Sequence, residues 1–117
     1  MKNLKELVSI KSFDTNQNKE IIDYLIRRFT PYAQEIVKVK STVDNREGLI
    51  VGLNTKVENV DNALILSGHI DTVVADEQKY NTDPYTPTLI GGKMYGLGTI
   101  DMKSYFGVIL DNIEQIK

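Results

Sequence analysis

The stretch ALILSGHID, residues 63–71, decides the predicted fold of this 117-residue chain. It opens with the uninterrupted apolar run ALIL, which is flanked by Asn62 on one side and by Ser67 and Gly68 on the other. Runs of this kind are typical of strands that are buried on both faces of a mostly parallel sheet. We therefore predict an α/β fold in which residues 63–67 form a central strand of a mixed, mostly parallel sheet with helices on both faces.

Polar residues follow at the point where this strand is predicted to end. Because ligands of open α/β sheets bind at the carboxyl ends of the strands, His69 and Asp71 lie at the edge expected to be functional. His69 is the single histidine of the sequence. A neutral imidazole is a common metal ligand, and its other ring nitrogen usually needs an acceptor. Asp71 is a candidate for that acceptor, since side chains two residues apart on an extended backbone point to the same side.

A second polar segment, YGLGTIDMK at residues 95–103, carries another candidate ligand. Its two glycines suit a tight backbone path, and Asp101 comes just before an amphipathic helix. A carboxylate there can bind a metal, cap the helix, or do both. Taken alone, a His beside an Asp is more often a structural hydrogen-bonded pair than a metal site. One His with two Asp also matches no self-sufficient zinc motif.

The order of these motifs resembles that of the M20 family of metallopeptidases and deacylases. That family carries Gly-His-x-Asp after a buried strand, followed by Asp-Pro-aromatic, Gly-Lys-x-Tyr-Gly and an Asp-Met-Lys that precedes a helix. Here the same pieces follow in order as GHID at 68–71, DPY at 83–85, GKMYG at 92–96 and DMK at 101–103. Within the family, two further features are most similar to the acetylornithine deacetylase branch. They are YGLGT at 95–99 and the helical residues Phe106, Ile109, Leu110 and Asp111.

The resemblance implies a role for each matched residue. His69 would be a ligand to one metal ion, Asp101 would be the carboxylate that bridges two, and Asp71 would be the catalytic-site residue that orients His69. The implied cofactor is a pair of zinc ions, for which cobalt often substitutes. The peptide bond between Asp101 and Met102 is expected to be cis. Ser104 stands where the family usually has Gly, and we expect this departure to alter local packing without preventing the fold.

The resemblance also implies an activity, the hydrolysis of an amide bond. In the acetylornithine deacetylase branch, the substrate would be a small acylated amino acid, N-acetyl-L-ornithine, in a step of arginine biosynthesis. Two alternatives stay open. One is another M20 deacylase or peptidase, such as a succinyl-diaminopimelate desuccinylase. The other is a non-catalytic truncated module that acts in protein interaction.

Several parts of the family's active site have no counterpart in the sequence. The family takes a Glu-Glu pair, a further acidic ligand and a final His from beyond the Asp-Met-Lys helix, and Glu114 is a single Glu at the wrong place. We therefore expect residues 1–117 to be the N-terminal portion of a metal-dependent hydrolase catalytic domain of the zinc-exopeptidase-like type. The lid domain through which full-length members commonly form homodimers is not expected here. Alone, the chain is expected to be inactive and to bind zinc weakly.

Composition limits the remaining possibilities. A hydrophobic content of 41% and a charged content of 26% are ordinary for a globular domain. A net charge of -2 and a pI of about 5.4 give no electrostatic footprint for nucleic acid or for an anionic membrane. No run approaches the roughly 20 apolar residues that span a bilayer, and no secretory leader pattern is seen. Because there is no cysteine, a metal here would need N and O ligands, and the composition is compatible with the cytoplasm.

Local patterns predict the other elements. Apolar spacing indicates a short helix that starts near Leu4 and ends near Ser12, and a core helix from an Asn16 N-cap to Pro31. Its last-turn cations are expected to be solvated. An antiparallel hairpin is predicted for 35–41 with 49–53, a small hairpin for 88–90 with 93–95, and a final helix after Asp101.

The segment 74–88 is predicted to be a long polar loop, and long loops of compact domains are often functional. Its Tyr80 and Tyr85 have two possible roles. They either line a substrate entrance or pack against the rim of the domain, and packing is the favoured interpretation.

Overall fold

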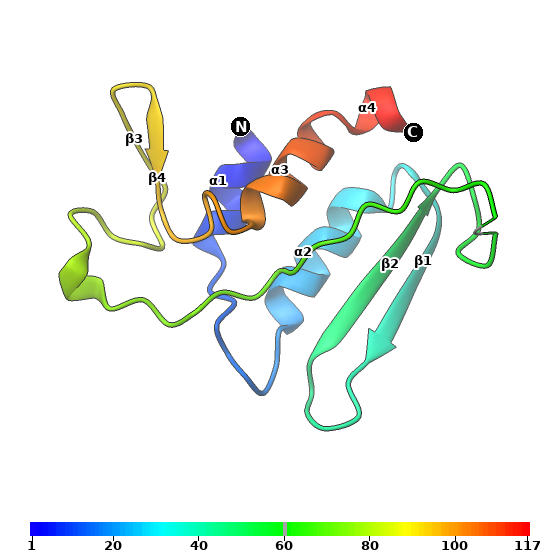
Figure 1. Cartoon of the computed structure of the whole chain (residues 1–117), viewed down its shortest axis with the longest axis horizontal. Helices are drawn as coiled ribbons and strands as arrows, with labels where there is room; N and C mark the ends of the chain where they lie inside the picture. The colour runs from blue at the N-terminus through cyan, green and yellow to red at the C-terminus, as the bar shows by residue number, and fades with distance from the viewer. Residues whose placement is uncertain (60) are drawn as a thin grey trace. The chain divides into compact units, whose positions relative to one another are not determined.

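The computed structural model describes residues 1–59 and 61–117. Four α-helices, one 3₁₀ helix and four strands are present in this part of the chain (Figure 1). In order they are α1 (Lys2–Ser9), α2 (Lys19–Phe29), β1 (Ala33–Lys40), β2 (Glu47–Leu53), η1 (Glu77–Lys79), β3 (Thr88–Ile90), β4 (Lys93–Tyr95), α3 (Lys103–Asp111) and α4 (Ile113–Ile116). The chain divides into two compact units. The first unit is Met1–Phe13 with Gly68–Asp111, and the second unit is Asp14–Ser67 with Asn112–Lys117.

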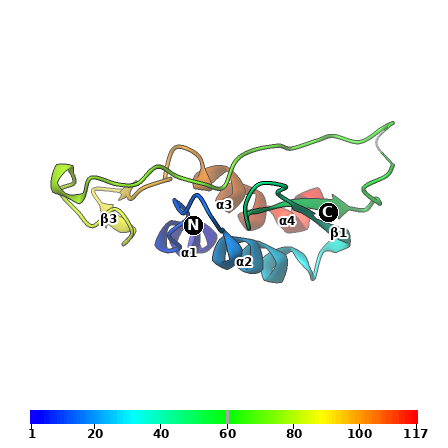
Figure 2. The same ribbon diagram turned by 90° about the horizontal axis from the view of Figure 1, so that it is seen from below.

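In the first unit, α1 and α3 pack side by side (Figure 2). Leu7 and Val8 of α1 are completely buried, as their helical spacing predicts. The two backbones approach closely at Gly107, where an added Cβ would lie 3.1 Å from the Leu4 Cα. Each buried aliphatic side chain contributes about 1.5–3 kcal/mol. The helix pair is therefore the apolar base on which the rest of this unit is built.

The ends of these helices differ from the predictions. The first helix ends at Ser9 instead of near Ser12, because Ile10 is already extended at φ -85° and ψ 119°. The predicted final helix is interrupted at Asn112, so that it becomes α3 and α4. The small hairpin of β3 and β4 is confirmed, and both turn residues, Gly91 and Gly92, have positive φ.

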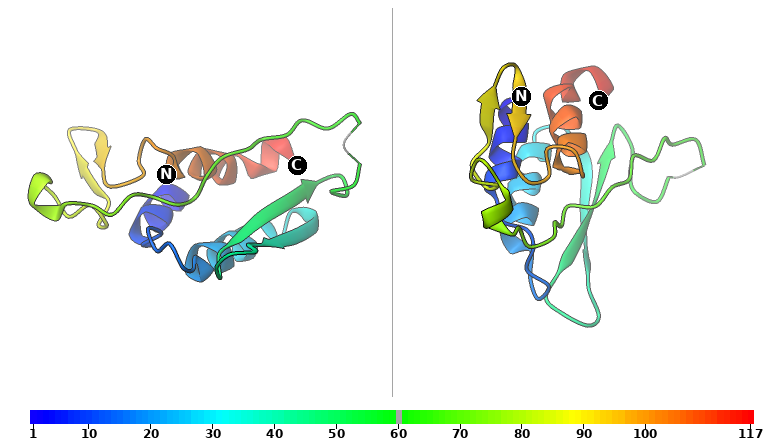
Figure 3. Two further views of the ribbon diagram at one scale, coloured as in Figure 1. Left: turned by 60° about the horizontal axis from the view of Figure 1, so that its bottom comes forward. Right: turned by 60° about the vertical axis from the view of Figure 1, so that its left-hand side comes forward.

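In the second unit, α2 packs along the hairpin of β1 and β2 (Figure 3). The hairpin is antiparallel, as predicted, with Lys40 opposite Glu47. The apolar stripe of α2 is also confirmed. Four of its five members are at most 7% exposed, and the fifth, Ile26, has intermediate exposure. The buried members are Ile21, Ile22, Leu25 and Phe29. Arg27 is exposed, as expected, whereas Arg28 is half-buried and its Nε has no hydrogen-bond partner among the described residues.

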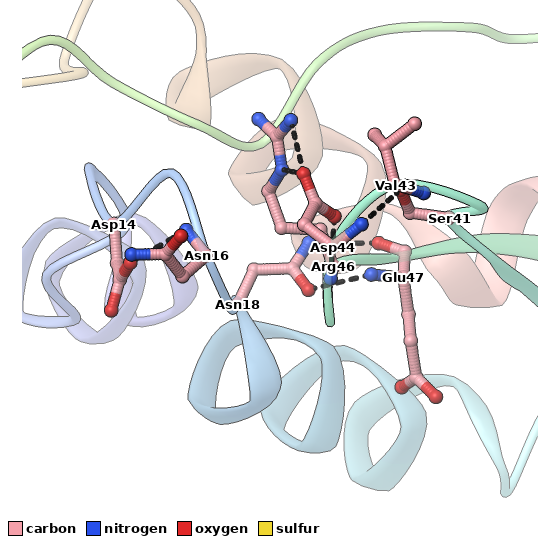
Figure 4. Close-up of polar contacts among 8 residues, drawn as sticks. All are labelled: Asp14, Asn16, Asn18, Ser41, Val43, Asp44, Arg46 and Glu47. Carbon is pink, nitrogen blue, oxygen red and sulfur yellow. Dashed lines mark hydrogen bonds and ion pairs between the residues drawn. The ribbon is translucent and has the colours of Figure 1, made fainter.

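A polar cluster joins the start of α2 to the start of β2 within this unit (Figure 4). The Asn18 amide donates to the Glu47 carbonyl at 2.7 Å, and its oxygen accepts from the Glu47 N–H at 2.8 Å. The predicted N-cap was Asn16, but Asn18 holds that position. Asn18 makes no side-chain bond to its own helix, because both ends of its amide are used by Glu47. The side chain therefore ties two elements together instead of capping one.

The loop before β2 is closed by a second set of bonds in Figure 4. Asp44 accepts from the Arg46 backbone N–H at 2.9 Å and from the Arg46 Nε at 2.8 Å. These hydrogen bonds from Arg46 lower the pKa of Asp44 to about 2. The carboxylate is thus ionised at neutral pH, and the turn keeps its charge-assisted bonds.

The prediction of a mostly parallel central sheet is wrong for this structure. Among the described residues, the strands form two separate two-stranded antiparallel sheets. Residues 63–67 have no strand assignment, and Leu64, Ile65 and Leu66 are 84%, 71% and 49% exposed. A central strand needs neighbours on both edges to pair its N–H and C=O groups. No described segment pairs with this run, so its apolar character alone does not bury it.

The α/β character of the prediction holds at the level of mixed helices and strands.

Within the described residues, no helix combines the length and the apolarity that a membrane crossing requires.

Replacing Asn18 tests the polar cluster. Asn18→Ala removes two part-buried hydrogen bonds to Glu47, so we expect a loss of about 1–3 kcal/mol in the free energy of unfolding, measured in urea. Asn16→Ala is the matched control, because that side chain is exposed two residues away. It should change stability by less than about 0.5 kcal/mol. Equal losses for the two variants would contradict the cluster's role.

The exposed run at 64–66 makes a second prediction. An exposed, unpaired apolar segment favours association between chains, so we expect this chain to self-associate as its concentration rises. Ile65→Lys should shift the sedimentation profile toward monomer without a loss of stability. Val43→Lys, at an apolar position that is 85% exposed in a loop, should leave association unchanged. A wild-type chain that stays monomeric at high concentration would argue against this prediction.

Candidate functional site

The side chains of His69 and Asp101 meet in the first unit, although they are 32 residues apart in the sequence. The distance from His69 Nε2 to Asp101 Oδ1 is 2.9 Å. His69 is 49% exposed and Asp101 is 82% exposed, so the pair is accessible from solvent. Both line a cleft of about 380 Å³ that is formed by residues 69, 71–73, 80 and 96–101. The structure therefore brings together the two residues that the sequence nominated as metal ligands.

The second ring nitrogen of His69 is held by the backbone. His69 Nδ1 lies 3.1 Å from the Asp71 carbonyl oxygen, whereas the nearest Asp71 carboxylate oxygen is 3.5 Å away. The expected acceptor was the Asp71 side chain. The main-chain oxygen is thus the nearer partner, and the carboxylate stays close as a longer electrostatic partner.

Both ring nitrogens of His69 thus face oxygen acceptors, an arrangement that favours the doubly protonated imidazolium. The hydrogen bond to Asp101 is the largest cause that raises the pKa of His69, and the Asp71 carbonyl adds to it. Because the folded pKa is raised, this interaction stabilises the fold below the unfolded pKa of about 6.5 and is lost as the pH rises through the folded pKa. Exposure to solvent keeps the effect on stability small.

Close packing at Gly68 brings the start of α3 to His69. An added Cβ at Gly68 would lie 2.6 Å from Met102 Cε and 3.1 Å from Phe106 Cζ. The His69 N–H also lies 3.4 Å from the Met102 sulfur. A side chain at position 68 would force the end of the Met102 side chain to shift and would press on the Phe106 ring of α3. The absence of a side chain at Gly68 therefore permits this close packing.

The loop 96–101 follows a path that its glycines permit. Gly98 has a φ of +89°, in the region that favours glycine. The loop is closed by a Thr99 hydroxyl that donates to the Gly96 carbonyl at 2.8 Å. The Asp101–Met102 peptide bond is cis, as the sequence led us to expect. The departure at Ser104 is accommodated, since its hydroxyl donates to the Ile100 carbonyl at 3.3 Å and α3 still forms.

The Asp-Pro-Tyr motif has a structural part in the site. Asp83 accepts from the Tyr85 N–H at 2.9 Å and from the Thr86 hydroxyl at 2.7 Å, which makes a tight turn. The Pro84 carbonyl at the centre of this turn accepts from the Leu97 N–H at 2.7 Å. The motif thus anchors the loop that ends at Asp101.

The two tyrosines of the long loop have different positions. Tyr85 is buried and packs against Phe13 with ring centroids 5.7 Å apart, which agrees with the favoured interpretation of packing. Tyr80 instead lines the cleft beside His69. Sequence reasoning gave no site role to Thr72, Val73 or Leu97, which also line the cleft, because nothing in their residue types marks them.

The donor set fits part of a zinc site. Imidazole nitrogen and carboxylate oxygen are ordinary zinc ligands, and in a tetrahedral site such atoms are about 3.4 Å apart. The pair of His69 and Asp101, now at 2.9 Å, would need to open by only a few tenths of an ångström. Within residues 1–59 and 61–117, however, no cluster of three or more His, Cys, Asp or Glu has a metal-binding arrangement. Among the described residues, the candidate metal ligands are therefore limited to His69 and Asp101.

Comparison with known proteins agrees with the motifs. Residues 65–117, which include all three candidate site residues, match Peptidase family M20/M25/M40. The acetylornithine deacetylase of Buchnera aphidicola subsp. Acyrthosiphon pisum (strain Tuc7) is 31% identical over 118 residues, which cover 96% of this chain and 30% of that protein. The acetylornithine deacetylase of Shigella sonnei (strain Ss046) is 49% identical over 53 residues, which cover 45% of this chain and 14% of that protein. The acetylornithine deacetylase of Aliivibrio salmonicida (strain LFI1238) is 42% identical over 66 residues, which cover 56% of this chain and 18% of that protein.

These matches confirm the resemblance predicted from the sequence. Over residues 65–117 the chain is similar to Peptidase family M20/M25/M40, and over stretches of 53 to 118 residues it is similar to acetylornithine deacetylases. It spans 30% of the length of the Buchnera relative and smaller shares of the other two.

The contacts of His69 make a prediction about its titration. Asp101→Asn should lower the pKa of His69 toward about 6.5, because it removes the carboxylate that favours the imidazolium. Asp71→Asn should lower it less, because the Asp71 carbonyl that faces Nδ1 remains in that variant. The pKa is measured from the ring proton signals across the pH range in the metal-free chain. A larger drop in Asp71→Asn would show that the carboxylate, and not the main chain, is the main partner of Nδ1.

Proposed function

We propose that this chain is part of a zinc-dependent amide hydrolase that removes the acetyl group from N-acetyl-L-ornithine, a step of arginine biosynthesis. The observation that carries the proposal is the 2.9 Å approach of His69 Nε2 to Asp101 Oδ1 at an open cleft. Similarity to acetylornithine deacetylases over part of their length supports the choice of substrate. The expected partner is thus a small acylated amino acid, and the expected location is the cytoplasm.

In this proposal His69 and Asp101 would hold the metal, and Asp101 would be the carboxylate shared by two zinc ions. When bound, zinc supplies Lewis acidity toward water and toward an amide carbonyl, and cobalt can replace it. Asp71 keeps the His69 ring in place through its main-chain carbonyl, while its carboxylate adds negative charge 3.5 Å from Nδ1. Such partners of a ligating histidine fix the direction of its free nitrogen.

The number of ligands defines what this chain does alone. A catalytic zinc ion ordinarily has three protein ligands, whereas His69 and Asp101 are two. General-base catalysis contributes about 10²- to 10⁴-fold, and no glutamate of the described residues lines the cleft. We therefore propose that residues 1–117 form one portion of a catalytic domain whose other ligands and base come from further sequence. In the full-length protein, a homodimer is the expected assembly.

The proposal predicts that the 117-residue chain neither retains zinc after dialysis nor hydrolyses N-acetyl-L-ornithine. A version extended to the length of its relatives should retain zinc and hydrolyse this substrate. His69→Ala should abolish both properties in the extended version. Asp76→Asn, an exposed carboxylate outside the cleft, serves as the control and should change neither.

The same assay separates the alternatives when an N-succinylated substrate is included. Preferential turnover of the succinylated compound would favour a desuccinylase over a deacetylase. An extended version that binds no zinc and turns over neither compound would favour the non-catalytic module. Stoichiometric zinc in the 117-residue chain itself would contradict the ligand count.

A further inference from the structure

The proposed function gives no role to Lys103. It is nevertheless the least exposed charged residue of the first unit. Its side chain is 1% exposed and is the largest fully buried side chain among the described residues. An ammonium group is rarely buried unless strong partners replace its water. Because Lys103 follows Asp101 by two residues at the first turn of α3, its placement bears on the site.

One partner of the Lys103 ammonium is the end of α1. Lys103 Nζ donates to the Ile10 carbonyl at 2.5 Å. Ile10 is the C-cap of α1, the residue at which the chain leaves the helix in an extended conformation. The bond links residues that are 93 positions apart in the sequence. It fastens the start of α3 to the end of α1.

The stem of Lys103 supports the loop that carries Asp101. An added Cβ at Gly98 would lie 2.9 Å from Lys103 Cδ and 3.0 Å from Cγ. The loop backbone therefore rests directly on the methylene groups of the lysine. Ser104, the next residue, also donates its N–H to the Gly98 carbonyl at 3.2 Å. Gly98 of this loop is thus held by the Lys103 side chain and by the Ser104 N–H at the start of α3.

A single short segment, residues 8–12, contacts both halves of the site, and we call it the 8–12 clamp. The Val8 side chain lies beneath Gly96, where an added Cβ would be 2.7 Å from Val8 Cγ1. Farther on, the Ser12 carbonyl accepts from the Thr72 N–H at 3.1 Å, next to Asp71. Between these two contacts lies the Ile10 carbonyl that Lys103 binds. The segment that carries His69 and Asp71 and the loop that carries Asp101 both contact this clamp.

We propose that Lys103 is a positioning residue: by joining the 8–12 clamp to the loop 96–101, it sets the separation of Asp101 from His69. The link to metal binding rests on the proposed function, but the separation itself is a property of the metal-free chain. The contacts that carry this effect are those of Lys103 with the Ile10 carbonyl and with Gly98, at the first turn of α3.

The test compares Lys103→Met with Leu110→Ala in the metal-free 117-residue chain. Methionine matches the length of the stem and removes the ammonium, while Leu110 is a buried apolar residue of the same helix that is 5% exposed. The readout is the pair of ring nitrogen chemical shifts of His69, which report the hydrogen bond to Asp101. We expect Lys103→Met to move the Nε2 signal toward that of a solvated imidazole and Leu110→Ala to leave it unchanged. Circular dichroism verifies that both variants are folded.

Lys103→Arg extends the comparison, because it keeps a positive charge and N–H donors at the same place. Partial or complete return of the wild-type ring signal in this variant would support positioning by the charged group. An unchanged signal in folded Lys103→Met would overturn the proposal. Equal changes in Lys103→Met and Leu110→Ala would also overturn it, since they would reflect a general loss of stability.

If Lys103→Met does not fold, a second pair of variants tests the positioning role through the 8–12 clamp. Leu7 and Val8 are neighbours on α1 and both are completely buried, but only Val8 belongs to the clamp. Val8→Ala should shift the His69 Nε2 signal more than Leu7→Ala, although the leucine variant loses more buried carbon. The opposite order would overturn the proposal. None of these readouts depends on hydrolysis, so the positioning role and the proposed function can fail separately.

Discussion

The structure of the first unit depends on how closely the first turn of α3 can approach its neighbours. A methyl group at Gly68 or Gly98 would crowd the side chains of Met102, Phe106 and Lys103, which lie at or just before the start of α3. Dense packing of this kind transmits small displacements instead of absorbing them. The position of Asp101 is therefore fixed by contacts on the far side of the helix start as much as by its own hydrogen bond to His69.

The sequence predicted the local elements well, because their determinants are local. The stripe of α2 follows from helical spacing, and the turn at Gly91 and Gly92 follows from the conformational freedom of glycine. It failed for residues 63–67, since the burial of a strand depends on neighbours that an apolar run does not specify. It also misplaced the N-cap of α2, because Asn16 and Asn18 have the same chemistry and the sequence does not show which of them directly precedes the helix.

In the candidate site, too, the sequence predicted features that depend on residue type and missed features that depend on tertiary contacts. His69 and Asp101 were found because their residue types and motif order point to metal chemistry, and the structure brings them together. Lys103 was not found, since a lysine in a sequence is normally taken as a surface residue and nothing local signals its burial. The Asp71 carbonyl beside His69 Nδ1 was not predicted, because a main-chain carbonyl leaves no mark in a sequence.

That main-chain partner has a consequence for how the site tolerates genetic change. A carbonyl is present whatever residue stands at position 71, so drift at that codon cannot remove it. Only a change in the course of the backbone between Gly68 and Thr72 would remove this contact. The orientation of the imidazole thus depends on the backbone conformation, and selection can act on the Asp71 carboxylate for a separate role.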